Sequence, residues 1–166
     1  MTRLLNWPVA VLAGTAVLIG AVGADRAPAL ALINESPSVP EGVYVRAPRG
    51  RIEIGSIVAI PQPTETRAYL GSLGMPGSIL LLKRVAAVGG QRVCVRDEMV
   101  ETPHRRVFAR ARDRRGARLP AWRGCRVMRT DELFLLGDTP GSFDSRYFGP
   151  VSRSEATGVY REVLTW

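Results

Sequence analysis

One stretch, Ile79-Leu80-Leu81-Leu82-Lys83-Arg84-Val85-Ala86-Ala87-Val88, constrains the fold most strongly. A near-continuous apolar run of this length is typical of a strand buried on both faces or of a short buried helix. The β-branched residues at its ends and the Gly89-Gly90 turn that follows favour a strand. We therefore expect the rest of the chain to build a sheet around residues 79–88.

Lys83, in the middle of this run, is the only lysine among 23 lysines and arginines. A desolvated lysine amine can lose its proton near neutral pH, whereas an arginine guanidinium cannot. Burial lowers a lysine pKa by as much as ~3–5 units. We therefore interpret Lys83 as a candidate general base. The alternative is a lysine whose amine snorkels from a strand edge to water.

Length and composition limit the class of protein. A chain of 166 residues can form one domain with an apolar core. The formal net charge of +8 suggests an anionic neighbour, but the few aromatic residues are not interleaved with the basic ones, so we expect no nucleic-acid partner. Two cysteines and one histidine, His104, are too few for a typical zinc site. We expect no metal and no cofactor, and a Ser-His-Asp triad has little support.

The N-terminal segment predicts a membrane anchor. Residues 7–24 form an uncharged run of 18 residues, which as a helix would span ~27 Å of a bilayer core of ~30 Å. A second apolar patch, residues 27–33, follows it directly. We expect residues 1–28 to be an uncleaved signal anchor, and the alternative is a signal peptide cleaved after Val22-Gly23-Ala24.

The charge pattern predicts how this anchor is oriented. Arg3 and the amino terminus favour a cytoplasmic N-terminus, although Arg26 on the far side weakens the bias. The chain would then cross the inner (cytoplasmic) membrane once. Residues 29–166 would lie on the periplasmic or other extracytoplasmic side, beside the lipid bilayer.

Residues 29–166 are expected to form one β domain. One helical turn is expected around residues 66–73. Besides the run around Lys83, five segments have strand patterns: 43–45, 51–60, 91–96, 132–136 and 158–166.

Arginine-rich residues 101–124 are interpreted as a basic insertion, either solvated or in contact with acidic lipid headgroups. Cys94 and Cys125 flank the insertion, and outside the cytoplasm they can pair and close it at its base.

Three motifs stand in order along the chain. They are Ser36-x-Ser38-x-Pro40-x-Gly42-x-Tyr44, then Leu82-Lys83-Arg84-Val85, then Gly137-Asp138 followed by Ser142-x-Asp144-Ser145-Arg146-Tyr147-Phe148-Gly149-Pro150. Together they resemble the type I signal peptidases, and the first motif is most similar to the conjugative-transfer, TraF-like branch. The resemblance implies a mainly β fold with the curved antiparallel sheet of signal peptidases and LexA-like proteins, carried on one N-terminal transmembrane helix.

The resemblance also assigns catalytic roles. Ser38 corresponds to the nucleophile and Lys83 to the general base. The Ser36 hydroxyl and the backbone N–H of Ser38 correspond to the oxyanion hole. Such a dyad fits the residue types, because a serine hydroxyl is a poor nucleophile until a base within hydrogen-bond reach takes its proton.

The third motif supplies supporting residues. By resemblance, Ser142 contacts the base, and Asp144 and Arg146 form an ion pair that shapes the site. Two departures argue against the general secretory enzyme. Val39 and then Pro40 follow the nucleophile directly, and the turn after the lysine strand is Gly89-Gly90-Gln91.

The implied function is a membrane-anchored serine endopeptidase that cleaves signal sequences of exported precursors, with a conjugative propilin as the implied partner. The alternative is a non-catalytic, membrane-anchored binding or assembly component of a transfer apparatus, with the motifs kept for structure. Autoproteolytic Ser–Lys repressors share the dyad, but this chain has no room for a DNA-binding domain.

Overall fold

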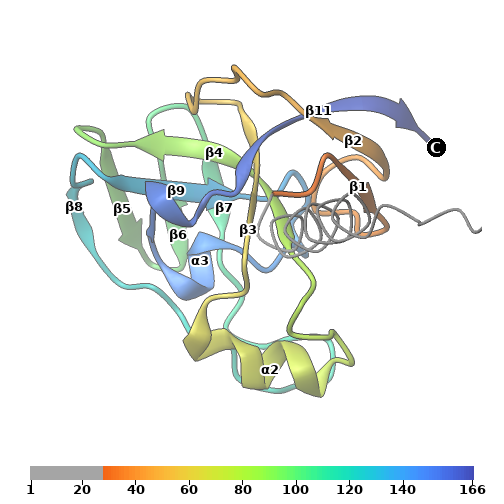
Figure 1. Cartoon of the computed structure of the whole chain (residues 1–166). Coiled ribbons are helices and arrows are strands. Elements are labelled where there is room, and N and C mark those ends of the chain that lie inside the picture. Colours follow the sequence, from red (N-terminus) through yellow and green to blue (C-terminus); the bar gives the residue numbers. More distant parts are fainter. Residues whose placement is uncertain (1–27) are drawn as a thin grey trace, which may run out of the picture.

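The computed structural model describes residues 28–166 and is mainly β (Figure 1). A seven-stranded antiparallel sheet has the order β1-β2-β11-β3-β4-β9-β10, and a four-stranded antiparallel sheet has the order β7-β6-β5-β8. The larger sheet is curled, as the resemblance implied.

The larger sheet comprises β1 (Ala31–Asn34), β2 (Gly42–Arg46), β3 (Ile57–Ile60), β4 (Leu81–Val88), β9 (Glu132–Leu136), β10 (Val151–Ser152) and β11 (Gly158–Thr165). The smaller sheet comprises β5 (Arg92–Arg96), β6 (Met99–Glu101), β7 (Arg106–Phe108) and β8 (Cys125–Val127). The helices are η1 (Thr64–Thr66), α2 (Arg67–Ser72), α3 (Ser145–Phe148) and η2 (Arg153–Glu155).

The apolar run around Lys83 is β4, between β3 and β9 in the larger sheet. The strand begins at Leu81, two residues later than the expected start at Ile79, whose side chain is exposed. Lys83 pairs with Val58 of β3, and six of the eight residues of β4 are buried. Burial on both faces explains why apolar residues dominate the strand.

The apolar patch at residues 27–33 partly folds into the domain. Ala31–Asn34 form β1, which pairs with β2 through Ala31↔Val45 and Ile33↔Val43. This patch is therefore not simply a continuation of the proposed anchor. Most of that anchor, residues 1–28, lies outside the described residues. Within residues 28–166, no helix is long and apolar enough to cross a membrane.

The disulfide expected from the sequence is present. Cys94 and Cys125 face each other in the register of β5 and β8, and their Cα atoms are 3.8 Å apart. The bond closes the basic insertion at its base, as predicted.

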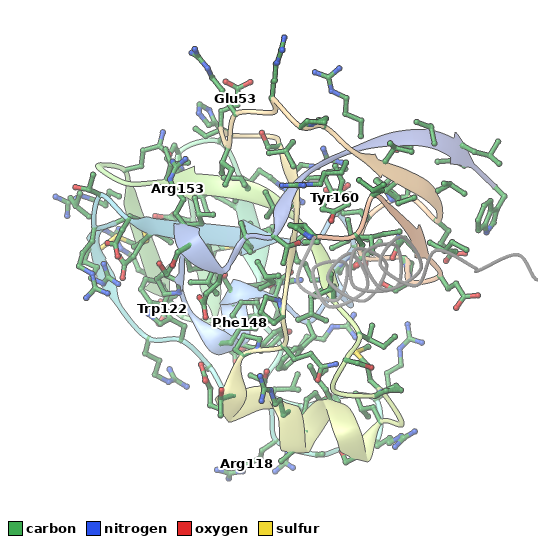
Figure 2. The ribbon with its side chains drawn as sticks, in the orientation of Figure 1. Glu53, Arg118, Trp122, Phe148, Arg153 and Tyr160 are labelled. Carbon is green, nitrogen blue, oxygen red and sulfur yellow. A yellow bond between two sulfur atoms is a disulfide. The ribbon has the colours of Figure 1, made fainter. Side chains whose placement is uncertain are left out.

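The insertion is more ordered than a solvated loop. It includes β7, and the ring of Trp122 packs 5.3 Å from that of Phe134. Its far end lies beside α2, where Tyr69 donates a hydrogen bond to Asp113 (3.2 Å) and where Figure 2 places Arg118 at the edge of the domain.

Two segments differ from their expected structure. Residues 51–60 were expected to be one strand, but only Ile57–Ile60 form β3, because Gly55 adopts a positive φ of 87° within a turn. The short helix α3 was not predicted. It forms because the Asp144 side chain accepts a hydrogen bond from the backbone N–H of Arg146 and so caps the first turn.

Candidate active site

The first motif forms the turn between β1 and β2, residues 35–41, which we call the serine loop. Asn34, buried at the end of β1, holds this loop through its side-chain amide. Its Nδ2 donates to the carbonyl oxygens of Ser36, Val39 and Pro40 at 2.8–2.9 Å. Sequence reasoning missed Asn34, although an amide two residues before the first serine was a visible signal.

Ser36, Ser38 and Lys83 converge at this loop. The hydroxyl oxygens of Ser36 and Ser38 are 2.8 Å apart. The Ser38 hydroxyl donates to the carbonyl oxygen of Leu82 at 3.4 Å, and the Lys83 amine donates to the same oxygen at 3.0 Å. Because both groups lie around one oxygen atom, Ser38 Oγ and Lys83 Nζ cannot be further apart than the sum of these two distances.

Lys83 is 4% exposed, so the alternative of a snorkelling lysine is wrong. Burial lowers the pKa of its amine to about 8, because the charged form loses its hydration. The carboxylates of Asp144 and Asp138 act in the opposite direction, and the guanidinium of Arg146 lowers the pKa further. The amine can therefore be neutral at a mildly alkaline pH.

The loop that follows β9 also contacts the serine loop, through Asp138. The backbone N–H of Asp138 donates to the carbonyl oxygen of Ser38 at 2.6 Å. Arg84 donates two hydrogen bonds to the Asp138 carboxylate, at 2.9 and 2.7 Å, and Arg105 of the basic insertion lies 3.5 Å from it. These contacts hold the pKa of Asp138 below its usual value, chiefly through the bond from Arg84.

Asp144 and Arg146 form a buried ion pair with contacts of 2.7 and 2.8 Å. The Asp144 carboxylate also accepts from the backbone N–H of Gly137 at 2.8 Å, and Arg146 donates to the carbonyl oxygens of Ser142 and Phe108. A buried charge pair is tolerated when further hydrogen bonds satisfy its remaining donors and acceptors. Here those bonds tie the loop after β9 to the basic insertion.

Ser142 is buried and lies directly against Gly137. Within residues 28–166, its hydroxyl has no hydrogen-bond partner, and the hydrogen bond of the Lys83 amine goes to Leu82 instead. The expected contact between Ser142 and the base therefore stays a prediction. Residues 28–166 also contain no group of three or more His, Cys, Asp or Glu side chains that could hold a metal ion.

Comparison with known proteins matches residues 4–166 to the family described as "Signal peptidase, peptidase S26". The chain belongs to this signal peptidase family. A "Plasmid transfer protein TraF" of Escherichia coli is 32% identical over the full length of both chains.

Two further relatives of this chain carry similar descriptions. A "Probable conjugal transfer protein TraF" of Sinorhizobium fredii is 36% identical over 81% of this chain and 77% of its own length. A "Conjugal transfer protein TraF" of Agrobacterium fabrum is 33% identical over 99% of this chain and 95% of its own length. The resemblance to type I signal peptidases and to their TraF-like branch is confirmed.

In this member of the signal peptidase family, the residues singled out in the sequence fall into two connected groups. Ser36, Ser38 and Lys83 gather around the serine loop. Asp144 and Arg146 lie behind them and reach the loop through Gly137 and Asp138. His104 belongs to neither group and is exposed in the turn between β6 and β7.

Proposed function

We propose that this member of the signal peptidase family is a serine endopeptidase in which Ser38 is acylated and Lys83 is the general base. The observation that carries the proposal is that the Ser38 hydroxyl and the buried Lys83 amine share the carbonyl oxygen of Leu82. A neutral amine that turns from this oxygen to Ser38 Oγ when substrate binds can take the hydroxyl proton as the oxygen attacks a peptide carbonyl. The same amine can then return that proton to the leaving amino group.

The oxyanion would be held by the Ser36 hydroxyl and the Ser38 backbone N–H. These two groups are already neighbours, because the N–H of Ser38 lies 3.4 Å from Ser36 Oγ, which is long for a hydrogen bond. A weak bond of this kind leaves the Ser38 N–H available for a substrate oxygen, and the Ser36 hydroxyl, 2.8 Å from Ser38 Oγ, can turn toward the same oxygen. One donor in such a site contributes about 3 kcal/mol to transition-state stabilisation.

The proposed substrate is the signal sequence of an exported precursor. The descriptions of the relatives, plasmid transfer and conjugal transfer proteins, support a precursor of a conjugative apparatus, and the family resemblance implies a propilin. The proposed location is the extracytoplasmic face of the inner membrane, with residues 1–28 as the anchor. The proposed location close to the membrane is supported by three apolar residues, Ile33, Val43 and Leu164, which lie in register across β1, β2 and β11 at one end of the larger sheet. Ile33 and Leu164 are exposed, as expected for a surface close to lipid.

The test is mass spectrometry of candidate membrane precursors incubated with the full chain. Ser38→Ala should abolish cleavage while leaving the fold intact by circular dichroism. Lys83→Arg should also abolish it, because a guanidinium keeps the charge but cannot act as a base. Ser154→Ala, a change at an exposed serine outside the three motifs, serves as the matched control and should cleave normally.

Full activity in Lys83→Arg would end the Ser–Lys mechanism. If neither the wild-type chain nor any variant cleaves, the non-catalytic binding or assembly component becomes the favoured function. Ser36→Ala should cost less activity than Ser38→Ala, since one donor of the oxyanion hole remains.

A further inference from the structure

A surface depression of about 400 Å³ lies beside the candidate nucleophile. Pro37 and Val39, the two neighbours of Ser38, form one part of its lining. Asp138 contributes from the loop after β9, Glu41 adds a second acidic side chain, and Trp166 adds an aromatic ring. A substrate bound across Ser38 would therefore pass directly over this depression.

The fold brings Trp166 to this place through the register of β11. A one-residue irregularity between Glu162 and Leu164 shifts the pairing with β2, so that Thr165 faces Gly42. Gly42 is needed there, because a Cβ atom at this position would collide with the carbonyl oxygen of Leu164. The backbone N–H of Trp166 then donates to the carbonyl oxygen of Glu41 at 3.3 Å. Figure 1 shows the end of β11 on the same side of the domain as β1 and β2.

The depression contains two carboxylates with different surroundings. Both oxygens of Asp138 are occupied by Arg84, with Arg105 close by. Glu41 is half-buried, and within residues 28–166 no side chain or backbone N–H donates a hydrogen bond or forms an ion pair with its carboxylate. A half-buried carboxylate without such a partner gains from a cationic group supplied by a ligand.

Besides the Glu41 carboxylate, the aromatic ring of Trp166 can also bind a cation. Trp166 is 66% exposed, so its indole ring is accessible to a ligand. A lysine ammonium or an arginine guanidinium is attracted to the face of an indole ring within about 6 Å of its centre. The carboxylate of Glu41 and the ring of Trp166 therefore offer complementary contacts to one positively charged side chain.

We propose that this depression is a subsite for a lysine or arginine side chain of the precursor, within a few residues of the scissile bond. Glu41 and Trp166 are its specificity-determining residues. This inference rests on the proposed peptidase function, because a subsite is defined relative to a cleaved bond. Binding of a cationic peptide can nevertheless be measured without cleavage.

The first experiment measures cleavage. A precursor peptide that the full chain cleaves is prepared with Lys, Gln or Glu at each of the three positions on either side of the scissile bond. At one position, wild-type protein should prefer Lys over Glu by at least about tenfold in kcat/KM. Glu41→Lys should reverse that preference. Glu35→Lys is the matched control, because it makes the same charge change in the same loop at a residue that does not line the depression.

An unchanged preference in Glu41→Lys would overturn the proposal. An equal reversal in Glu35→Lys would also overturn it, because the effect would then be a general one of surface charge. Trp166→Leu should weaken the preference for Lys, and Trp166→Phe should restore part of it, since phenylalanine retains an aromatic face.

The second experiment separates this proposal from the peptidase function. The indole N–H signal of Trp166 in full-chain Ser38→Ala protein is followed by nuclear magnetic resonance. The probes are the acetylated, amidated peptides Ala-Ala-Lys-Ala-Ala, Ala-Ala-Gln-Ala-Ala and Ala-Ala-Glu-Ala-Ala. Only the Lys peptide should shift the signal in a saturable way, and Glu41→Gln should abolish that shift.

Saturable binding of the Lys peptide, together with no cleavage of any precursor by the wild-type chain, would refute the peptidase function but keep the cation subsite. Equal shifts by all three peptides would refute the subsite.

Discussion

The backbone N–H of Asp138 donates a hydrogen bond of 2.6 Å to the carbonyl oxygen of Ser38. The carboxylate of the same residue binds Arg84, the residue that follows Lys83. Asp138 therefore connects the strand that carries the candidate base to the loop that carries the candidate nucleophile. Its position depends in turn on Gly137, whose N–H is bound by Asp144.

Gly137→Ala should abolish cleavage and lower the melting temperature. A Cβ atom at Gly137 would collide with the Ser142 hydroxyl and come close to the carbonyl oxygen of Ser38. The loop must then move away from Ser38, which breaks the bond from Asp138. Gly141→Ala is the control, because a Cβ atom there meets nothing within 4 Å. Equal activity in the two variants, measured as initial cleavage rates, would contradict this account.

The cleavage rate should depend on the protonation of Lys83. With a pKa of about 8 for the buried amine, kcat/KM should fall roughly tenfold per pH unit below pH 8 and level off above it. His104→Ala should leave the profile unchanged, because that side chain is exposed and outside both groups of site residues. The pH–rate profile of the two proteins checks this. An inflection that moves in His104→Ala would show that another group is the base.

The same pKa shift predicts a stability cost. The unfolded chain holds the Lys83 proton up to about pH 10.5 and the folded chain only up to about pH 8, so the free energy of unfolding should rise between these values. Lys83→Met removes the buried amine and should stabilise the protein at pH 7 by up to about 3 kcal/mol.

Urea unfolding at pH 7, 8, 9 and 10 tests the stability prediction, and the gain from Lys83→Met should shrink as the pH rises. A constant difference between the two proteins would mean that Lys83 titrates alike in both states.

The sequence predicted those elements whose residue pattern has a single physical cause, such as burial. Burial on both faces made β4 visible as an apolar run and singled out Lys83 within it. The strand β1 was hidden because its outward residue Ile33 is apolar and exposed, so the segment lacked the polar alternation of a surface strand and was interpreted as part of the anchor region.

The third motif shows a different limit. Arg146 is 1% exposed, yet nothing in its own sequence position distinguishes a buried arginine from a surface one. Its burial depends on carbonyl oxygens supplied by Phe108 in the basic insertion and Ser142 in its own loop. Such partners become known only once the tertiary structure brings the segments together, which is also why the role of the insertion was underestimated.

Asn34→Leu should lower kcat much more than it raises KM. The Asn34 amide holds three carbonyl oxygens of the serine loop. A leucine of similar size keeps the packing but leaves the oxygens of Ser36 and Val39 without a donor, while that of Pro40 keeps the Tyr44 hydroxyl at 2.7 Å. Each unsatisfied buried group costs about 1–3 kcal/mol, so stability should fall as well. Asn34→Asp retains the size but loses the donor, and it should behave like the leucine variant. Wild-type kcat in Asn34→Asp would show that the amide does not position Ser38.

Replacing both cysteines should destabilise the domain and weaken the support of Arg146. The Cys94–Cys125 bond links residues 31 apart, and in the chain-entropy model a crosslink of that span contributes roughly 3–4 kcal/mol. The loop that it closes contains two partners of Arg146, since Phe108 accepts from its guanidinium at 2.9 Å and Trp122 donates to its carbonyl oxygen at 3.0 Å.

Thermal unfolding and cleavage assays of Cys94→Ala/Cys125→Ala, with and without reductant, check the disulfide prediction. The melting temperature of the wild-type protein should fall toward that of the variant when reductant is added, while the variant itself should not respond. Cleavage by the variant should be lost at a lower temperature than cleavage by the oxidised wild-type protein, because the loop after β9 loses its support as the insertion opens. If reductant lowers both melting temperatures equally, the bond does not account for the stability of the insertion.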